Sequence, residues 1–129
     1  MILHILLGFI GAAILLSYTS KKYPKRLIKV WENALLIAAG IYVGFALLGQ
    51  NWEWLPIEFG GVVIYGTFVF LSRKYSPYFL AFGWAAHVLW DLVLHPNGHP
   101  GYVPTWYPGA CLGFDLAIAG YLIWYFFRK

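Results

Sequence analysis

Residues Trp84–Asp115 read WAAHVLWDLVLHPNGHPGYVPTWYPGACLGFD. An apolar segment is followed by a loop rich in glycine and proline, and a second apolar segment begins near Pro108. The stretch contains three of the four histidines, both aspartates and the only cysteine of the chain. The side chains best suited to catalysis or metal binding are therefore concentrated in one part of an otherwise apolar sequence.

The composition is that of a membrane protein. Of the 129 residues, 61% are hydrophobic and 11% are charged, whereas soluble domains average about 25% charged residues. Long apolar runs between the charged positions are typical of transmembrane helices. The sequence predicts one all-α, multi-pass transmembrane domain over residues 1–129. A lone cysteine excludes a disulfide within the chain.

Five transmembrane helices are expected, over residues 2–18, 27–48, 57–72, 78–95 and 108–127. Pro96 should end the fourth helix, because proline removes a backbone donor and breaks the helix. Pro108 suits the first turn of the fifth. In an alternative arrangement the short first segment lies in the membrane interface, and only four helices cross the membrane.

The basic residues predict the orientation in the membrane. They form three clusters, each at the end of an apolar run. The clusters comprise Lys21, Lys22, Lys25, Arg26 and Lys29; Arg73 and Lys74; and Arg128 and Lys129. Five helices place all of them on one side, which the positive-inside rule assigns to the cytoplasm. We therefore expect a multi-pass protein of the cell (inner) membrane, with its N-terminus outside and its C-terminus inside. This distribution forms no basic face for phosphates, so no nucleic-acid partner is expected.

His87, Asp91 and His95 are spaced four residues apart, so they share one face of a regular helix. They extend over about 12 Å of helix axis. One metal ion could bind two neighbours of this series, but not all three without a distortion of the helix. Asp115 should lie about 10 Å into the fifth helix, at a depth close to that of Asp91 or His87.

Two aspartates at this depth need partners, because each charge in the hydrocarbon costs at least about 2.5–3.5 kcal/mol. No lysine or arginine lies near them in the predicted topology, which leaves imidazoles and a divalent cation. The expected metal ligands are His87, Asp91, His95, Asp115 and His99. Zn is favoured and Fe is an alternative, because imidazole and carboxylate suit both. Glu58 or Asp91 is expected to act as general base.

These residues predict a metal-dependent hydrolase that acts on a membrane lipid or another apolar small molecule in the outer half of the membrane. A second hypothesis is a carrier or channel subunit, which moves protons or a divalent ion along the His87–Asp91–His95 series. A third is a non-catalytic membrane assembly protein, in which the polar cluster is purely structural.

Two pairs of small residues, Gly40 with Gly44 and Gly109 with Gly113, have the spacing of close helix–helix contacts. They indicate tight packing within the bundle or, alternatively, a homo-oligomer that forms through one of these pairs.

Several short strings of this sequence carry a resemblance to a known family. They are His87-x3-Asp91-x3-His95-Pro96, Pro104, Trp106-Tyr107-Pro108 and Cys111-x-Gly-Phe-Asp115. They resemble a family of small bacterial multi-pass membrane proteins that is described only as a domain of unknown function. This likeness covers most of the chain and implies no activity.

A looser similarity is to intramembrane zinc hydrolases of the alkaline ceramidase and adiponectin-receptor type, which use three histidines with a serine and an aspartate. This chain departs from them, because Gly83 stands four residues before His87, no H-x3-H pair lies within an expected helix and fewer than seven helices are expected. The similarity implies only that a zinc-activated water can operate within a bilayer.

Overall fold

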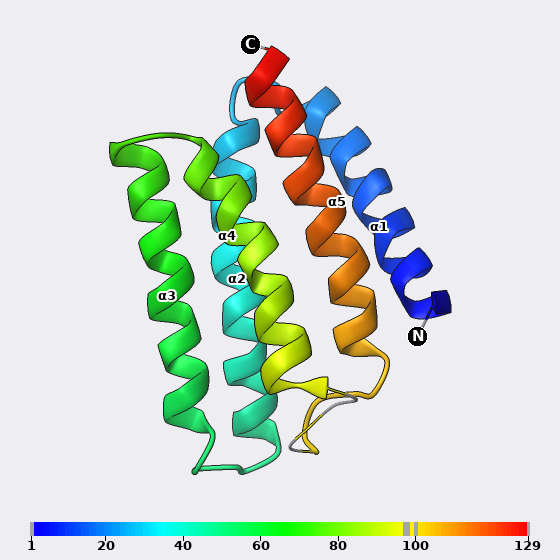
Figure 1. The fold of residues 1–129 in the computed structure, drawn as a ribbon, viewed down its shortest axis with the longest axis vertical. Coiled ribbons are helices and arrows are strands. Elements are labelled where there is room, and N and C mark those ends of the chain that lie inside the picture. The colour runs from blue at the N-terminus through cyan, green and yellow to red at the C-terminus, as the bar shows by residue number, and fades with distance from the viewer. Residues whose placement is uncertain (1, 97–98, 100, 129) are drawn as a thin grey trace.

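The computed structural model describes residues 2–96, 99 and 101–128, which form a helical bundle (Figure 1). Its elements are α1 (Ile2–Lys22), α2 (Leu27–Leu48), α3 (Leu55–Lys74), α4 (Tyr78–Leu89), the π-helical segment η1 (Trp90–Leu94) and α5 (Tyr107–Arg128). The described residues include no strand. The all-α prediction is therefore confirmed.

Four of the helices, α1, α2, α3 and α5, are long and apolar enough to cross a membrane. The helix of α4 and η1, Tyr78–Leu94, is apolar but shorter. The sequence had suggested that the first helix was the short one. Instead α1 continues four residues past Tyr18 to Lys22, because its last turn includes the lysines that follow the apolar run.

The connections place the basic residues together. In Figure 1 the α1–α2 loop, the α3–α4 loop and the C-terminus lie at one end of the bundle, and the other connections lie at the opposite end. The first end, here called the basic end, carries the lysines and arginines of the described chain. Glu32 is buried near it and pairs with Arg73, whose Nε lies 3.0 Å from Glu32 Oε1.

Neighbouring helices pack in the spatial order α1, α5, α4, α3, α2, and α1 has only marginal contact with α2. The α1–α5 contact depends on glycine. A Cβ at Gly8 would lie 1.8 Å from the Ala110 carbonyl oxygen, and one at Gly113 would lie 2.0 Å from the Ile5 carbonyl oxygen. Gly113 of the predicted Gly109/Gly113 pair therefore serves packing within the chain. By contrast, the described atoms leave open space beside Gly40 and Gly44.

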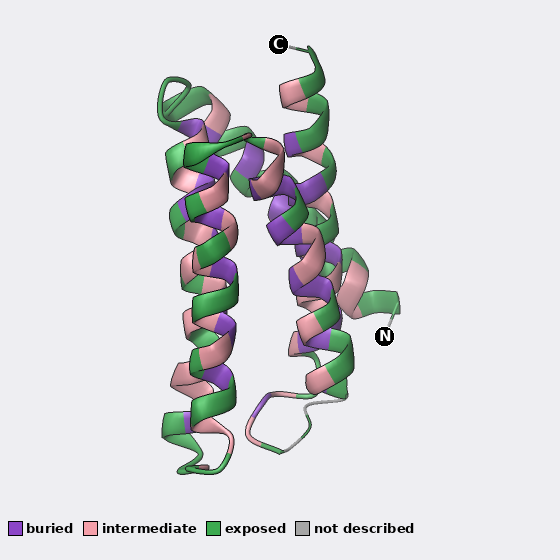
Figure 2. Ribbon diagram, turned by 60° about the vertical axis from the view of Figure 1, so that its left-hand side comes forward, coloured by how far each residue is buried: buried purple, intermediate pink, exposed green. Residues whose placement is uncertain are grey.

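The outward faces of the helices are apolar, which suits contact with lipid. Exposed residues run along the outer side of each helix in Figure 2, and many are large and hydrophobic, such as Leu48, Val63 and Phe127. Side chains such as Leu35, Leu80 and Leu122 fill the interior.

The fourth helix changes its winding at the polar residues. From Trp90 to Leu94 the backbone is π-helical, and His95 leaves the helix at φ −124° and ψ 42°. A π-turn is wider than an α-turn, so the direction of His95 no longer follows from the four-residue spacing. The distortion that the sequence required for a shared site is present, but it turns His95 toward a different partner.

Candidate functional site

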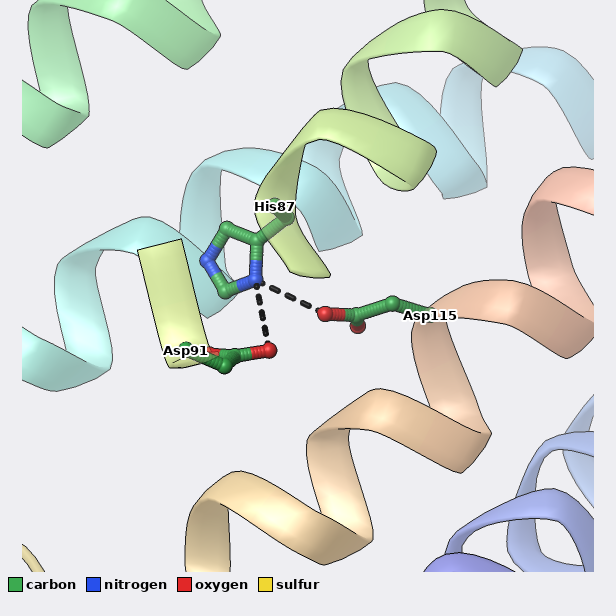
Figure 3. A group of neighbouring side chains, drawn as sticks. All are labelled: His87, Asp91 and Asp115. Carbon is green, nitrogen blue, oxygen red and sulfur yellow. Dashed lines mark hydrogen bonds and ion pairs between the residues drawn. The ribbon is translucent and has the colours of Figure 1, made fainter. Parts of the chain in front are cut away.

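Three polar side chains meet inside the bundle, and together they are called the polar centre: His87, Asp91 and Asp115. His87 Nδ1 lies 2.9 Å from Asp115 Oδ2 and 3.6 Å from Asp91 Oδ2. Figure 3 shows the imidazole nitrogen directed between the two carboxylates. All three side chains are almost completely buried. A single imidazole thus joins α4, η1 and α5.

The polar centre is incompletely satisfied. Tyr42, which is fully buried on α2, donates a hydrogen bond to Asp91 Oδ1. Asp91 Oδ2 and His87 Nε2 are buried without a hydrogen-bond partner among the described residues. Buried polar atoms are nearly always paired, so an unpaired carboxylate oxygen beside an imidazole points to a missing partner.

That partner is not a basic side chain. Within residues 2–96, 99 and 101–128, the only pair between an acid and a lysine or arginine is Arg73–Glu32. One donor atom each from His87, Asp91 and Asp115 fits within 4.8 Å of the others. Imidazole and carboxylate are the ligands that Zn and Fe accept. The polar centre could therefore hold a metal ion.

A second group, here called the Glu58 cluster, consists of Glu58, Trp90, His95 and Tyr102. Trp90 Nε1 donates to Glu58 Oε1 at 3.1 Å, and His95 Nε2 lies 3.0 Å from Glu58 Oε2. Tyr102 also donates to Oε2. Burial, together with this hydrogen bond, raises the pKa of Tyr102, so its hydroxyl remains a donor.

The protonation of His95 follows from its partners. Its Nδ1 lies 2.7 Å from the backbone oxygen of His99, and a carbonyl only accepts, so Nδ1 carries a proton. The contact between Nε2 and Glu58 then needs one more proton, shared between imidazole and carboxylate. Both groups are fully buried, so the contact between His95 and Glu58 is enclosed within the bundle.

Tyr42 connects the two groups. Its ring stacks on that of His95, with 4.3 Å between centroids and 8° between planes, while its hydroxyl binds Asp91. Displacement of the connection between η1 and α5 would therefore disturb both groups.

An apolar groove of about 840 Å³ lies between α1, α2 and α5. Its lining includes Leu7 and Gly11 of α1, Ala38 of α2, and Cys111 and Asp115 of α5. Asp115 therefore belongs both to the polar centre and to the wall of the groove. His4, in the first turn of α1, lines the same groove.

The structure divides the residues that the sequence had grouped. It brings His87, Asp91 and Asp115 together, and it places His95 with Glu58 in the separate Glu58 cluster. The His99 side chain is exposed and lies against the Trp54 ring, with 5.5 Å between centroids.

Sequence reasoning missed three partners of the acids: Tyr42, Trp90 and Tyr102. Tyrosine and tryptophan in membrane helices are commonly interface anchors, so residue type gave no signal. Tyr42 and Trp90 lie inside expected helices, at 27–48 and 78–95, and these two positions differed from that pattern.

Comparisons with known proteins add no assignment, since no protein-family model, curated protein or solved structure matches this chain.

Proposed function

We propose that the protein is a membrane-embedded, metal-dependent hydrolase of an apolar substrate. One observation carries the proposal: Asp115 lines an apolar groove and also contacts His87 in a buried group that could hold a metal ion. The groove would bind the apolar part of the substrate, and the polar centre would act on the group beside it. Catalytic sites commonly combine an apolar pocket with a few converging polar groups.

His87 Nδ1, one oxygen of Asp115 and Oδ2 of Asp91 are the proposed ligands. A divalent ion of the Zn or Fe type would lower the pKa of a bound water toward neutrality. Tyr42 fixes Oδ1 of Asp91, so the other oxygen of that carboxylate is aimed at the centre. The expectation that Glu58 is the base now has less support, because three side chains already engage its carboxylate.

Proton transport remains a second proposal, because the stack of Tyr42 on His95 brings the Glu58 cluster next to the polar centre, although no hydrogen bond joins the two rings. Glu58, His95, Tyr42 and Asp91 form a polar series that ends at Asp115. Toward the basic end, the described neighbours of Asp115 on α5 are apolar, among them Ile118 and Leu122. This arrangement suits a localised metal or catalytic site better than a continuous proton path across the membrane.

We also propose the orientation that the sequence predicts, with the basic end in the cytoplasm and the opposite end of the bundle outside. The basic residues gather at one end of the bundle, which supports this orientation. The polar centre would then lie in the outer half of the membrane.

Purified protein tests the proposed activity. It is stripped with a chelator in detergent, reloaded with Zn²⁺ or Fe²⁺, and assayed on an uncharged long-chain ester, p-nitrophenyl palmitate. Hydrolysis should depend on the added ion and be lost in Asp115→Asn. The exposed acid Glu53 provides the matched control, Glu53→Gln, which should retain full activity. Metal-independent hydrolysis, or equal activity in both variants, would exclude the proposal.

A further inference from the structure

The groove is elongated along α1. Its lining runs along α1 from Leu3 to Thr19, which corresponds to about 24 Å at 1.5 Å per residue. The hydrocarbon layer of a bilayer is about 30 Å thick. An elongated molecule that lies parallel to the helices therefore fits better than a compact one.

Lipid hydrocarbon is the natural occupant of this space. The groove exists because α1 packs on α5 and barely touches α2, so it lies at the lipid-facing side of the bundle. The groove has a volume of about 840 Å³ and an apolar lining, and water gains little in such surroundings. At this depth the available filler is a hydrocarbon chain.

Charge limits which lipid can bind. No lysine or arginine is among the described lining residues, whereas Asp115 is. A phosphate or carboxylate head drawn into the groove would meet neither lysine nor arginine there, and in the metal-free protein it would face the Asp115 carboxylate. An uncharged molecule meets no such penalty.

Depth places the polar group of that molecule. Asp115 is the ninth residue of α5, which begins at Tyr107, and therefore lies about 12 Å along the helix axis from its start. A group beside Asp115 thus lies below the headgroup layer. The groove lining also includes the rings of Trp31, Trp84 and Phe114, which pack on one another with centroids 5.9–6.2 Å apart.

We propose that the groove binds one uncharged long-chain lipid, whose chain lies between α1, α2 and α5 and whose polar group lies beside Asp115. This names the substrate class for the proposed function and rests on it for the role of Asp115. Binding of the chain itself depends on the width of the groove and needs no metal.

A larger side chain at Gly11 would narrow the groove, so this position tests whether a lipid chain binds there. It lines the groove, and the described structure has nothing within 4 Å of a Cβ built there. Gly11→Leu would fill the groove without a clash in the bundle. Gly120 on α5 is equally open but lies outside the groove lining, so Gly120→Leu is the matched control. Ala38→Leu narrows the groove from α2.

The probe is a hexadecanol analogue with a mid-chain diazirine, photolysed with the protein in phosphatidylcholine vesicles. Sites of labelling are read by tandem mass spectrometry. Saturable labelling should concentrate on the groove residues and weaken by about tenfold in Gly11→Leu and in Ala38→Leu, but not in Gly120→Leu. In chelator-stripped protein, unlabelled hexadecanol should compete, and hexadecyl phosphate should compete poorly.

The outcomes separate the two proposals. If the groove is labelled saturably, Asp115→Asn keeps this labelling and the wild-type protein binds no metal, the lipid site is supported and the proposed metal-dependent hydrolase activity is excluded. Bound metal with uniform, unsaturable labelling overturns the lipid site alone. Equal competition by hexadecyl phosphate, or labelling that both groove variants leave unchanged, also overturns it. So does a chemically cross-linked dimer whose groove is shielded from the probe, because a second copy would then be the occupant.

Discussion

His87 on α4 and Asp115 on α5 are 28 residues apart in sequence, and their side chains meet with 2.9 Å between Nδ1 and Oδ2. This contact joins the two helices at the level where Asp91 also approaches the imidazole. Because all three groups are buried, removal of one member leaves the others without compensation. The pair is therefore both a structural link and the centre of the proposed chemistry.

Loss of the contact between His87 and Asp115 should lower the free energy of unfolding. His87→Ala leaves two buried carboxylates without an imidazole, and loss of one member of a buried charged pair typically costs about 3–5 kcal/mol. A double-mutant cycle with Asp115→Asn, measured by unfolding of the metal-free protein in detergent, should give strong coupling. The matched pair is Arg73–Glu32, in which the Arg73 side chain is 55% exposed, and its coupling should stay below about 1 kcal/mol. Similar coupling in both cycles would contradict this account.

Tyr42 should act on the metal through Asp91. Tyr42→Phe removes the donor to Asp91 Oδ1 and frees that carboxylate to rotate. Loss of such a supporting hydrogen bond typically lowers metal affinity about 10–100-fold. The control is Tyr65→Phe, because the Tyr65 hydroxyl donates to the Ala86 backbone oxygen instead of to an acid. Competition with a fluorescent chelator measures both affinities, and equal values would refute the role of Tyr42.

The contact of α1 with α5 should depend on Gly113. Gly113→Ala places a methyl group against the Ile5 carbonyl oxygen, and such overpacking usually costs about 1–3 kcal/mol. Gly120→Ala meets open space and should change the free energy of unfolding by less than about 1 kcal/mol. Thermal unfolding in detergent compares the two. An unchanged unfolding midpoint for Gly113→Ala would mean that α1 does not pack against α5 at Gly113.

Tyr102 should tether the connection between η1 and α5. Its pKa is raised by burial and by the hydrogen bond to Glu58, so the folded state favours the protonated hydroxyl. The stabilisation is then fully present below the ordinary value of about 10 and is lost as the pH rises through the higher folded value. The backbone amides of residues 101–106 should be more strongly protected from hydrogen exchange in the wild-type protein than in Tyr102→Phe, from about pH 6 to 9. Tyr75→Phe, at the basic end, should have no effect there.

Much of the fold could be predicted from composition and periodicity. The apolar runs and basic clusters gave the helices and placed the lysines and arginines together at one end. The length of α1 was underestimated, because a charged last turn ends an apolar run without ending the helix. How α1 packs could not be predicted, since a small residue such as Gly113 serves equally a contact within the chain and one between chains.

The site could be predicted only in part. Regular spacing correctly placed His87 beside Asp91, and depth correctly placed Asp115 at the same level. His95 was also expected there, but the π-helical turn after Leu89 redirects it to Glu58. Spacing assumes regular geometry, and π-turns are inserted where the packing of neighbouring helices favours them. That information resides in the tertiary contacts of Trp90 and Tyr42, not in the local sequence.

Metal content of the purified protein tests the central claim most directly. Protein isolated in detergent without added chelator is analysed by inductively coupled plasma mass spectrometry, alongside His87→Ala, Asp115→Asn and the exposed control His99→Ala. The account predicts about one Zn or Fe per chain, retained in His99→Ala, lost in the other two, and released as the pH falls because the ligands must be deprotonated. A wild-type protein that remains folded yet binds neither ion after reloading, or equal metal content in all four proteins, would contradict it.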